Sequence, residues 1–395
     1  MMFKGRHILI IVENLPVPFD RRVWQEANTL RENGAKISII CPKMKGYTKS
    51  FEIINDIEIY RHPLPIEGKG AFGYFLEYTI ALFWEFTLGL KIFVKKRFQV
   101  IQGCNPPDLI FLIAVFYKLF GVKYIFDHHD INPELYIAKY RKKGIFYKFM
   151  VLAERLTFAT ANYSIATNES YKEIAIRRGK MPPEKVQIVR SGPKLERLKL
   201  TVGNKIYKKG RDFLIGYVGV IGEQEGLDLL LESAKHIVSI RKDVQFAIIG
   251  DGTELENIKT IATKMGLEDF VDFYGRVDDH TMVEILNTAD ICVNPDRPTE
   301  MNNLSTMNKI MEYMALKKPI VQFNLKEGRH SAKDASLYAD NTSTTDFSNK
   351  IMWLLDHEEE RIRMGETGYK RIINNLSWKH ESQNLLNIYR KVFNL

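Results

Sequence analysis

The chain has 395 residues, of which 45% are hydrophobic and 27% are charged. This length exceeds what one ordinary hydrophobic core holds, and it predicts two domains of roughly 150–200 residues each. The composition is that of a globular protein and excludes a low-complexity chain. The three cysteines are widely spaced and lie in apolar segments, and they do not have the spacing of metal ligands. They therefore indicate buried free thiols in a reducing cytosol.

Positive charge is concentrated in the first half of the chain. Residues 1–200 hold 32 Lys and Arg against 19 Asp and Glu, a net charge of +13, whereas residues 201–395 hold 25 against 29, a net charge of −4. This asymmetry favours an anionic partner for the first half: a phospholipid surface, a pyrophosphate-bearing acceptor or nucleic acid. We find no nucleic-acid recognition motif, so no nucleic-acid partner is expected. A solvated basic surface that binds no partner remains an alternative interpretation.

Apolar segments of strand length alternate with helical patterns along the whole chain. Helical periodicity is clear at Val23–Asn33, Leu227–Arg241, Glu254–Met265 and His280–Asn287. The expected strands are His7–Val12, Lys36–Cys41, Val100–Gln102, Lys123–Asp127, Tyr163–Ala166, Gln187–Val189, Phe213–Val218, Gln245–Ile249, Val271–Tyr274, Ile291–Val293 and Pro319–Phe323. Buried strands that alternate with helices predict parallel sheets covered on both faces.

The alternation occurs twice, with a polar break near Lys194–Asp212. We therefore predict two doubly wound α/β domains, at residues 1–200 and 201–375, that face each other across a cleft. The amphipathic segment Trp378–Val392, within residues 376–395, is expected to pack back onto the N-terminal domain. Ligands of such sheets bind at the carboxyl ends of the strands.

The most lipid-like segment is Tyr78–Val94. Glu85 and Lys91 interrupt it, and it falls short of the ~20 apolar residues that a spanning helix needs. It predicts either a core helix or a helix that lies in a membrane interface, with Phe83, Trp84, Phe86 and Phe93 as apolar bulk and Lys95–Arg97 as charge at its end.

Two polar loops of the first half follow predicted strands. In the loop after the first strand, Asp20 is a candidate N-cap for a helix that begins with Arg21 and Arg22, a tolerable arrangement if an anion lies there. In the second loop, His128 and His129 are flanked by Asp127 and Asp130. Neighbouring residues rarely ligate one ion together, so we expect no metal and favour a histidine that hydrogen-bonds a substrate. A structural histidine pair remains an alternative.

In the second half, three glycine-containing loops end predicted strands, and a fourth strand-end segment begins at Ser305. The glycine loops contain Gly222, then Gly250 to Gly252, then Gly275 with Arg276 and Val277. Ser305 and Thr306 look like the N-cap of a helix that carries Lys309 and Glu312 three residues apart. A helix start favours an anion such as a phosphate, and a carboxylate one turn further can accept from ribose hydroxyls. An amphipathic helix with a surface ion pair is the alternative.

In these residues the chain resembles the family 4 glycosyltransferases, which are retaining enzymes of the GT-B fold with two Rossmann-like domains. The resemblance covers nearly the whole chain and is nearest to transferases of bacterial or archaeal surface polysaccharides, often with N-acetylated amino sugars. It rests on the order and spacing of five segments: residues 17–24, 127–134, 225–230, 250–252 and 309–315.

The resemblance implies a nucleotide-sugar donor, expected to be UDP-linked, bound mainly by the second domain. It implies that Glu312 binds the ribose, that Gly275, Arg276 and Val277 meet the base, and that His129 lies near the reacting sugar. The expected catalytic residues are therefore His129, Lys309 and Glu312. The expected donor contacts also include Gly222, Gly252, Ser305, Thr306 and Asn308, and the expected acceptor-side residues are Asp20, Arg21, Arg22 and His128.

Transfer in this family retains the sugar's configuration and generally needs no metal or other cofactor, and the chain has no Asp-x-Asp triplet. The expected acceptor is a lipid-linked sugar or an oligosaccharide. We accordingly expect a cytoplasmic protein at the inner face of the cell membrane, in contact with its anionic surface.

Two departures from the family pattern concern charge. Many members have an arginine and a lysine where this chain has Val220 and Glu225, and a second glutamate where it has Leu304. We expect Lys309, the helix start at Ser305, and Arg21 or Arg22 to replace the missing phosphate cations. The alternatives are a nucleotide-sugar epimerase on the same fold and a non-catalytic sugar-nucleotide-binding subunit. A dehydrogenase is disfavoured because no Gly-x-Gly-x-x-Gly follows the first strand.

Overall fold

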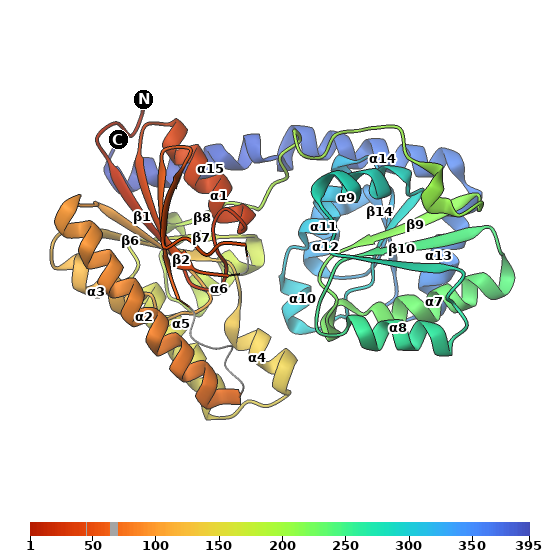
Figure 1. The fold of residues 1–395 in the computed structure, drawn as a ribbon, viewed down its shortest axis with the longest axis horizontal. Coiled ribbons are helices and arrows are strands. Elements are labelled where there is room, and N and C mark those ends of the chain that lie inside the picture. Colours follow the sequence, from red (N-terminus) through yellow and green to blue (C-terminus); the bar gives the residue numbers. More distant parts are fainter. Residues whose placement is uncertain (45, 64–69) are drawn as a thin grey trace. The chain divides into compact units, whose positions relative to one another are not determined.

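The computed structural model describes residues 1–44, 46–63 and 70–395 (Figure 1). The chain forms two compact units, one of Met1–Ser191 with Glu381–Leu395 and one of Gly192–His380. The boundary predicted after residue 200 therefore lies inside the second unit. The predicted fold class of two parallel-sheet α/β domains is confirmed.

The first unit contains an eight-stranded sheet. In spatial order its strands are β3 (Phe51–Ile54), β4 (Ile57–His62), β2 (Lys36–Pro42), β1 (His7–Val12), β5 (Val100–Cys104), β6 (Lys123–His128), β7 (Tyr163–Ala166) and β8 (Val186–Ile188). Its helices are α1 (Arg21–Glu32), α2 (Gly70–Lys95), α3 (Phe111–Lys118), α4 (Asn132–Tyr140), α5 (Ile145–Thr160), α6 (Glu169–Arg177), the 3₁₀ turn η1 (Pro183–Lys185) and most of α15 (Trp378–Phe393).

The central strand β1 is buried along its whole length, as its apolar run Ile8–Val12 predicts for a parallel strand covered on both faces. It pairs in parallel with β2 and β5. The antiparallel hairpin β3–β4 was not predicted. Its strands alternate apolar with polar residues, and its two-residue turn is Asn55-Asp56, both with positive φ, which is the backbone that tight hairpins need.

The second unit contains a six-stranded sheet in which every pair is parallel. Its spatial order is β11 (Val271–Gly275), β10 (Val244–Ile249), β9 (Phe213–Val218), β12 (Ile291–Asn294), β13 (Ile320–Phe323) and β14 (Ser336–Ala339). Its helical elements are η2 (Lys205–Lys208), η3 (Glu223–Glu225), α7 (Leu227–Ile240), α8 (Leu255–Lys264), α9 (Asp279–Thr288), α10 (Glu300–Leu304), α11 (Asn308–Ala315), α12 (Lys326–Ala332), η4 (Lys333–Ala335), α13 (Thr344–Asp356), α14 (Glu358–Arg371) and the π turn η5 (Ile372–Leu376).

Neighbouring residues of each strand in this unit face opposite cores. Ile215 and Ile248 pack with α7, α8 and α13 on one side of the sheet, whereas Leu214 and Ile249 pack with α9 and α11 on the other. The helix α11, which carries Lys309 and Glu312, is thus held against the sheet by the buried side chains of Ile310, Met311 and Met314.

The last helix, α15, contributes to the core of the first unit from Glu381 onward. Leu385, Ile388 and Tyr389 are buried, and the Tyr389 hydroxyl donates a hydrogen bond to Oε1 of Gln102 on β5. Glu381 accepts a hydrogen bond from the backbone N–H of Arg190 at 3.0 Å. The apolar stripe of this helix therefore covers the first sheet.

Among the described residues, none of the helices combines the length and the apolar content that crossing a membrane requires.

Candidate functional site

The glycine loops of the second unit follow β9, β10 and β11 at the carboxyl edge of the sheet. A Cβ on Gly250 would lie 1.8 Å from the carbonyl oxygen of Gly219, and one on Gly252 would lie 2.3 Å from that of Ile221. These glycines therefore allow two strand-end loops to touch each other. Gly275 has a φ of +63°, in the left-handed region, with open space around the missing Cβ.

The remaining predicted residues of these loops differ in exposure. Gly222 precedes the turn η3, and a Cβ there would meet the Glu225 carboxylate at 2.8 Å. Arg276 is exposed, and Val277 packs partly against the core beneath α9 and α11.

The start of α11 differs from the prediction. Ser305 and Thr306 do not cap it: α11 begins at Asn308, after Met307, which makes no side-chain cap. The hydroxyl of Ser305 instead donates to the Met301 carbonyl at 2.8 Å, at the end of the short helix α10, and Thr299 caps α10. The prediction was wrong because Thr299 opens an additional helical turn, which leaves Ser305 and Thr306 in the connection between the two helices.

Lys309 and Glu312 lie on α11 as predicted, but they do not pair with each other. Nζ of Lys309 donates to Oδ1 of Asp296 at 2.8 Å and lies 4.8 Å from the centre of the Tyr217 ring. The Glu312 carboxylate pairs with Arg197, whose other terminal nitrogen lies 3.1 Å from Asp279. These contacts fix both side chains at the carboxyl edge of the sheet.

The surroundings of Lys309 are acidic. Burial raises the pKa of both Asp296 and Glu225, although Lys309 lowers each of them. Asp296 and Asn294 are both buried, and the Asn294 side chain helps to lower the pKa of Asp296. This edge of the sheet therefore places a polar pair next to Lys309.

Sequence reasoning missed Arg197, Asp296, Asn294 and Tyr217. Asn294 and Asp296 directly follow the strand predicted at Ile291–Val293, so their strand-end position was a usable signal. Arg197 lies in the segment before the second sheet, far from α11 in sequence, and no local pattern marks it.

At the carboxyl edge of the first sheet, Asp127 is the centre of a buried network. It accepts from Arg22 at 2.9 Å and from the side-chain amide of Gln102 at 2.8 Å, and Nε2 of His129 lies 2.8 Å from its Oδ2. Although burial opposes ionisation, Arg22 and His129 hold the pKa of Asp127 well below its ordinary value. Glu26, which also meets Arg22, has a pKa raised by burial to about 8.

The two adjacent histidines have opposite environments. His128 is fully buried against Phe126, Phe158 and Tyr171, and burial lowers its pKa to about 3. Burial would also lower the pKa of His129, but the Asp127 carboxylate raises it above the ordinary value. His129 keeps 13% of its side chain exposed. The acceptor-side placement predicted for His128 is therefore wrong, because this last residue of β6 points into the core.

The predicted residues at the start of α1, Asp20 to Arg22, also differ from one another in exposure and contacts. The Asp20 carboxylate accepts from the backbone N–H of Val23 at 3.0 Å, so the predicted N-cap is confirmed. Arg21 is exposed, but Arg22 is buried and also donates to the Val189 carbonyl at 2.8 Å. Of the two arginines expected to replace the missing phosphate cations, Arg22 is held against Asp127, and Arg21 is the exposed one.

Within the described residues, one group has the spacing of a metal site: Cys104, Asp127 and His129, whose candidate ligand atoms lie within 4.8 Å of one another. The Arg22 guanidinium already lies against Asp127, so a divalent cation would add charge beside it. We assign no metal to this group.

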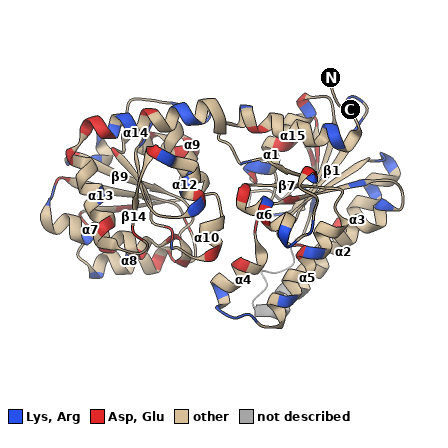
Figure 2. Cartoon of the chain, turned by 180° about the vertical axis from the view of Figure 1, so that it is seen from behind, with Lys and Arg blue, Asp and Glu red and all other residues tan. Residues whose placement is uncertain are grey.

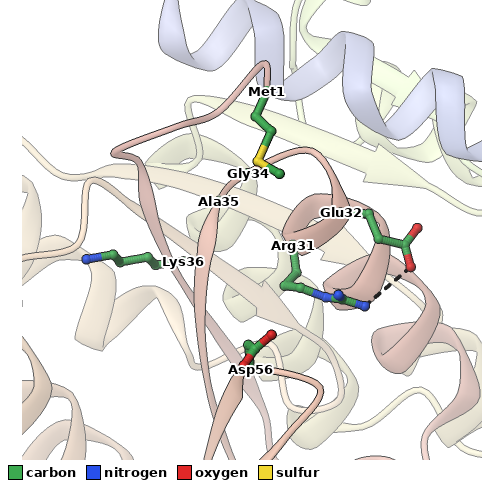
Figure 3. Close-up of a pocket in the computed structure, with 7 residues that line it drawn as sticks. All are labelled: Met1, Arg31, Glu32, Gly34, Ala35, Lys36 and Asp56. Atoms are coloured by element: carbon green, nitrogen blue, oxygen red, sulfur yellow. Dashed lines mark hydrogen bonds and ion pairs between the residues drawn. The ribbon is translucent and has the colours of Figure 1, made fainter.

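A surface hollow of about 420 Å³ lies near the amino end of β2, away from the strand ends described above (Figure 3). Arg31 and Glu32, which line it, lie 3.4 Å apart and pair with each other. It joins none of the predicted site residues, and its lining is Met1, Arg31, Glu32, Gly34, Ala35, Lys36 and Asp56.

Comparison with known families assigns each half of the chain. Residues 20–197 match the model described as glycosyltransferase family 4, and residues 202–371 match that of the glycosyl transferases group 1. The sheets and these matches define a glycosyltransferase of the GT-B fold. The family 4 match covers the first half of the chain, and the group 1 match covers the second half.

Individual relatives are distant in sequence. The chain is 24% identical over 181 residues to alpha-D-kanosaminyltransferase of Streptomyces kanamyceticus, covering 45% of this chain and 46% of that one. It is 26% identical over 333 residues to the capsular polysaccharide biosynthesis glycosyltransferase CapM of Staphylococcus aureus, covering 79% and 83%. The first of these alignments thus spans about half the length of the relative.

Solved structures share the fold. Sucrose-phosphate synthase of Thermosynechococcus elongatus superposes with a TM-score of 0.81 at 16% identity, covering 98% of this chain and 99% of that one. HepE of Anabaena, solved in complex with UDP and glucose, superposes with a TM-score of 0.73 at 12% identity, covering 98% and 99%. At these identities the likeness establishes the fold.

We predict opposite titration of the two histidines. In an NMR titration of the full chain, His129 should have a pKa above 6.5, whereas His128 should stay neutral down to about pH 4. Asp127→Asn should bring the His129 pKa below 6.5, because burial then acts without the carboxylate. Asp243→Asn, in the second unit, is the control and should leave it unchanged. A His129 pKa unaffected by Asp127→Asn would contradict the described pairing.

Proposed function

We propose that the protein transfers a sugar from a nucleotide sugar, with UDP as the nucleotide, to a lipid-linked or oligosaccharide acceptor in surface-glycan synthesis. Transfer retains the configuration of the sugar and needs no metal, and the sugar is a hexose or an N-acetylated amino sugar. The observation that carries the proposal is α11, which places a lysine and a carboxylate one turn apart at the carboxyl edge of the second sheet.

Each part of the nucleotide sugar is assigned to particular residues. The carboxylate of Glu312, held by Arg197, accepts from the ribose hydroxyls, and the loop of Gly275, Arg276 and Val277 meets the base. Lys309 turns from Asp296 to the pyrophosphate and, with the N-terminal end of α11 at Asn308, stabilises the charge on the departing nucleotide. His129, the more exposed of the two histidines, lies near the reacting sugar.

Names of relatives support the donor and the setting. HepE was solved with UDP and glucose, and CapM is named for capsular polysaccharide biosynthesis. The basic first half supports an anionic membrane as partner and a cytoplasmic protein bound at its inner face.

Replacement of Lys309 tests the donor site. Lys309→Ala should lower kcat by about 10²-fold or more, because it removes the cation that meets the developing phosphate charge. Arg241→Ala is the control, since Arg241 pairs with Asp243 and Asp356, outside the proposed site. The measurement is release of UDP together with sugar transferred to a lipid-linked acceptor. Near-wild-type rates for both variants would refute the assignment.

The same assay separates the rival functions. Conversion of the nucleotide sugar without transfer would indicate an epimerase. Binding of UDP-sugar in a thermal-shift screen without turnover on any lipid-linked acceptor would indicate a non-catalytic subunit, which the Val220 and Glu225 departures favour.

The acidic surroundings of Lys309 lead to a second prediction. Glu225→Lys should tighten UDP binding by roughly tenfold, because it replaces a like charge beside the pyrophosphate with an opposite one. Glu223→Lys is the matched control, since Glu223 lies on the same turn and is exposed. Isothermal calorimetry measures both. Equal affinities of the two variants for UDP would place the pyrophosphate away from Glu225.

A further inference from the structure

The first unit exposes large apolar side chains on three helices. Their spacing of three, four or seven residues gives each helix one apolar stripe. We call the set the apolar face: Leu76, Phe83, Trp84, Leu90 and Val94 on α2, Leu112, Val115, Leu119 and Phe120 on and just after α3, and Ile145, Phe146, Phe149, Leu152 and Leu156 on α5. Leu119 is 80% exposed and Ile145 is 78% exposed.

These helices form one surface, with α3 next to both α2 and α5 (Figure 1). Between α2 and α3, the ring centres of Phe86 and Phe116 are 5.2 Å apart, and those of Phe93 and Phe120 are 5.6 Å apart. Between α3 and α5, Lys118 donates to the Thr160 carbonyl at 2.5 Å. Soluble monomers rarely expose a contiguous apolar area of this kind, so such a face indicates a docking surface.

The exposed charges on this part of the chain all have the same sign, and its Lys and Arg residues are drawn blue in Figure 2. Between residues 76 and 160 every exposed charged side chain is Lys or Arg, whereas each Asp and Glu is buried or half-buried. The exposed cations are Lys91, Lys95, Lys96, Arg97, Lys123, Lys139, Arg141, Lys142, Lys143, Lys148 and Arg155.

We propose that the apolar face seats the first unit on an anionic phospholipid bilayer, with its apolar side chains at the acyl boundary and its cations among the headgroups. A second copy of this chain is a poor occupant, because two cationic faces repel each other. The proposal extends the proposed function, since a lipid-linked acceptor is reached from the bilayer surface.

Vesicle flotation of the full chain tests the proposal. The wild type should float with vesicles of phosphatidylcholine and phosphatidylglycerol, bind pure phosphatidylcholine far more weakly, and lose binding as salt is raised. The triple variant Phe146→Ser, Phe149→Ser, Leu152→Ser should bind at least tenfold more weakly. The matched control is Ile240→Ser with Ile362→Ser, two exposed apolar residues of the second unit, which should bind like the wild type.

Tryptophan fluorescence distinguishes insertion of the apolar face into the bilayer from electrostatic binding to its surface. Lipids brominated on their acyl chains should quench the protein's tryptophan fluorescence, and Trp84→Phe should remove most of that quenching, since Trp84 lies on the apolar face. Absence of wild-type binding to anionic vesicles, or equal binding by the α5 triple variant, would overturn the proposal. So would a wild-type dimer that the triple variant converts to monomers without any vesicle binding by either.

Activity separates failure of this inference from failure of the proposed function. The triple variant should transfer sugar to a water-soluble, short-chain acceptor at the wild-type rate, and lose at least tenfold on the same acceptor embedded in vesicles. Vesicle binding without transfer by the wild type would refute the proposed function alone. Equal transfer by both proteins to the embedded acceptor would refute the role of the apolar face.

Discussion

Parallel pairing of the strands is the constraint on which both candidate sites depend. Because the strands of each sheet run in one direction, apart from the edge strand β3, their carboxyl ends meet at one edge. The residues at and just after those ends include polar side chains in both units, with Asp127 and His129 in the first and Asn294 and Asp296 in the second. Strands that are buried on both faces leave these edges as the places where polar chemistry can gather.

The charge balance at the second edge sets this chain apart from the usual pattern of its family. Where many members have an arginine and a lysine, Val220 is exposed and Glu225 lies near Lys309. Lys309 therefore lies near two carboxylates, and burial raises the pKa of both. If the pyrophosphate binds as we propose, it competes with Asp296 for this lysine, and donor binding is coupled to the Lys309–Asp296 pair.

The sequence predicted the fold through its uninterrupted apolar strands, such as His7–Val12, and its amphipathic helices, such as Leu227–Arg241. It missed β3 and β4 because their alternation of apolar and polar residues is short, and it missed β14 as a brief strand at the sheet edge. It placed Lys309 and Glu312 on one helix and Asp20 at a helix cap, as the structure has them, whereas the roles of Lys309 and Glu312 stay predictions. It could not predict that Arg197 holds Glu312, or that His128 is buried while His129 is not, because tertiary packing decides both.

The central claim is that a UDP-sugar binds at the carboxyl edge of the second sheet, along α11 and the β11 loop. Hydrogen–deuterium exchange of the full chain with and without UDP tests it most directly. The account predicts slower exchange at residues 275–277 and 305–312 when UDP is added, with the first sheet largely unchanged. Unchanged exchange at both segments under saturating UDP, or protection confined to the first unit, would contradict it.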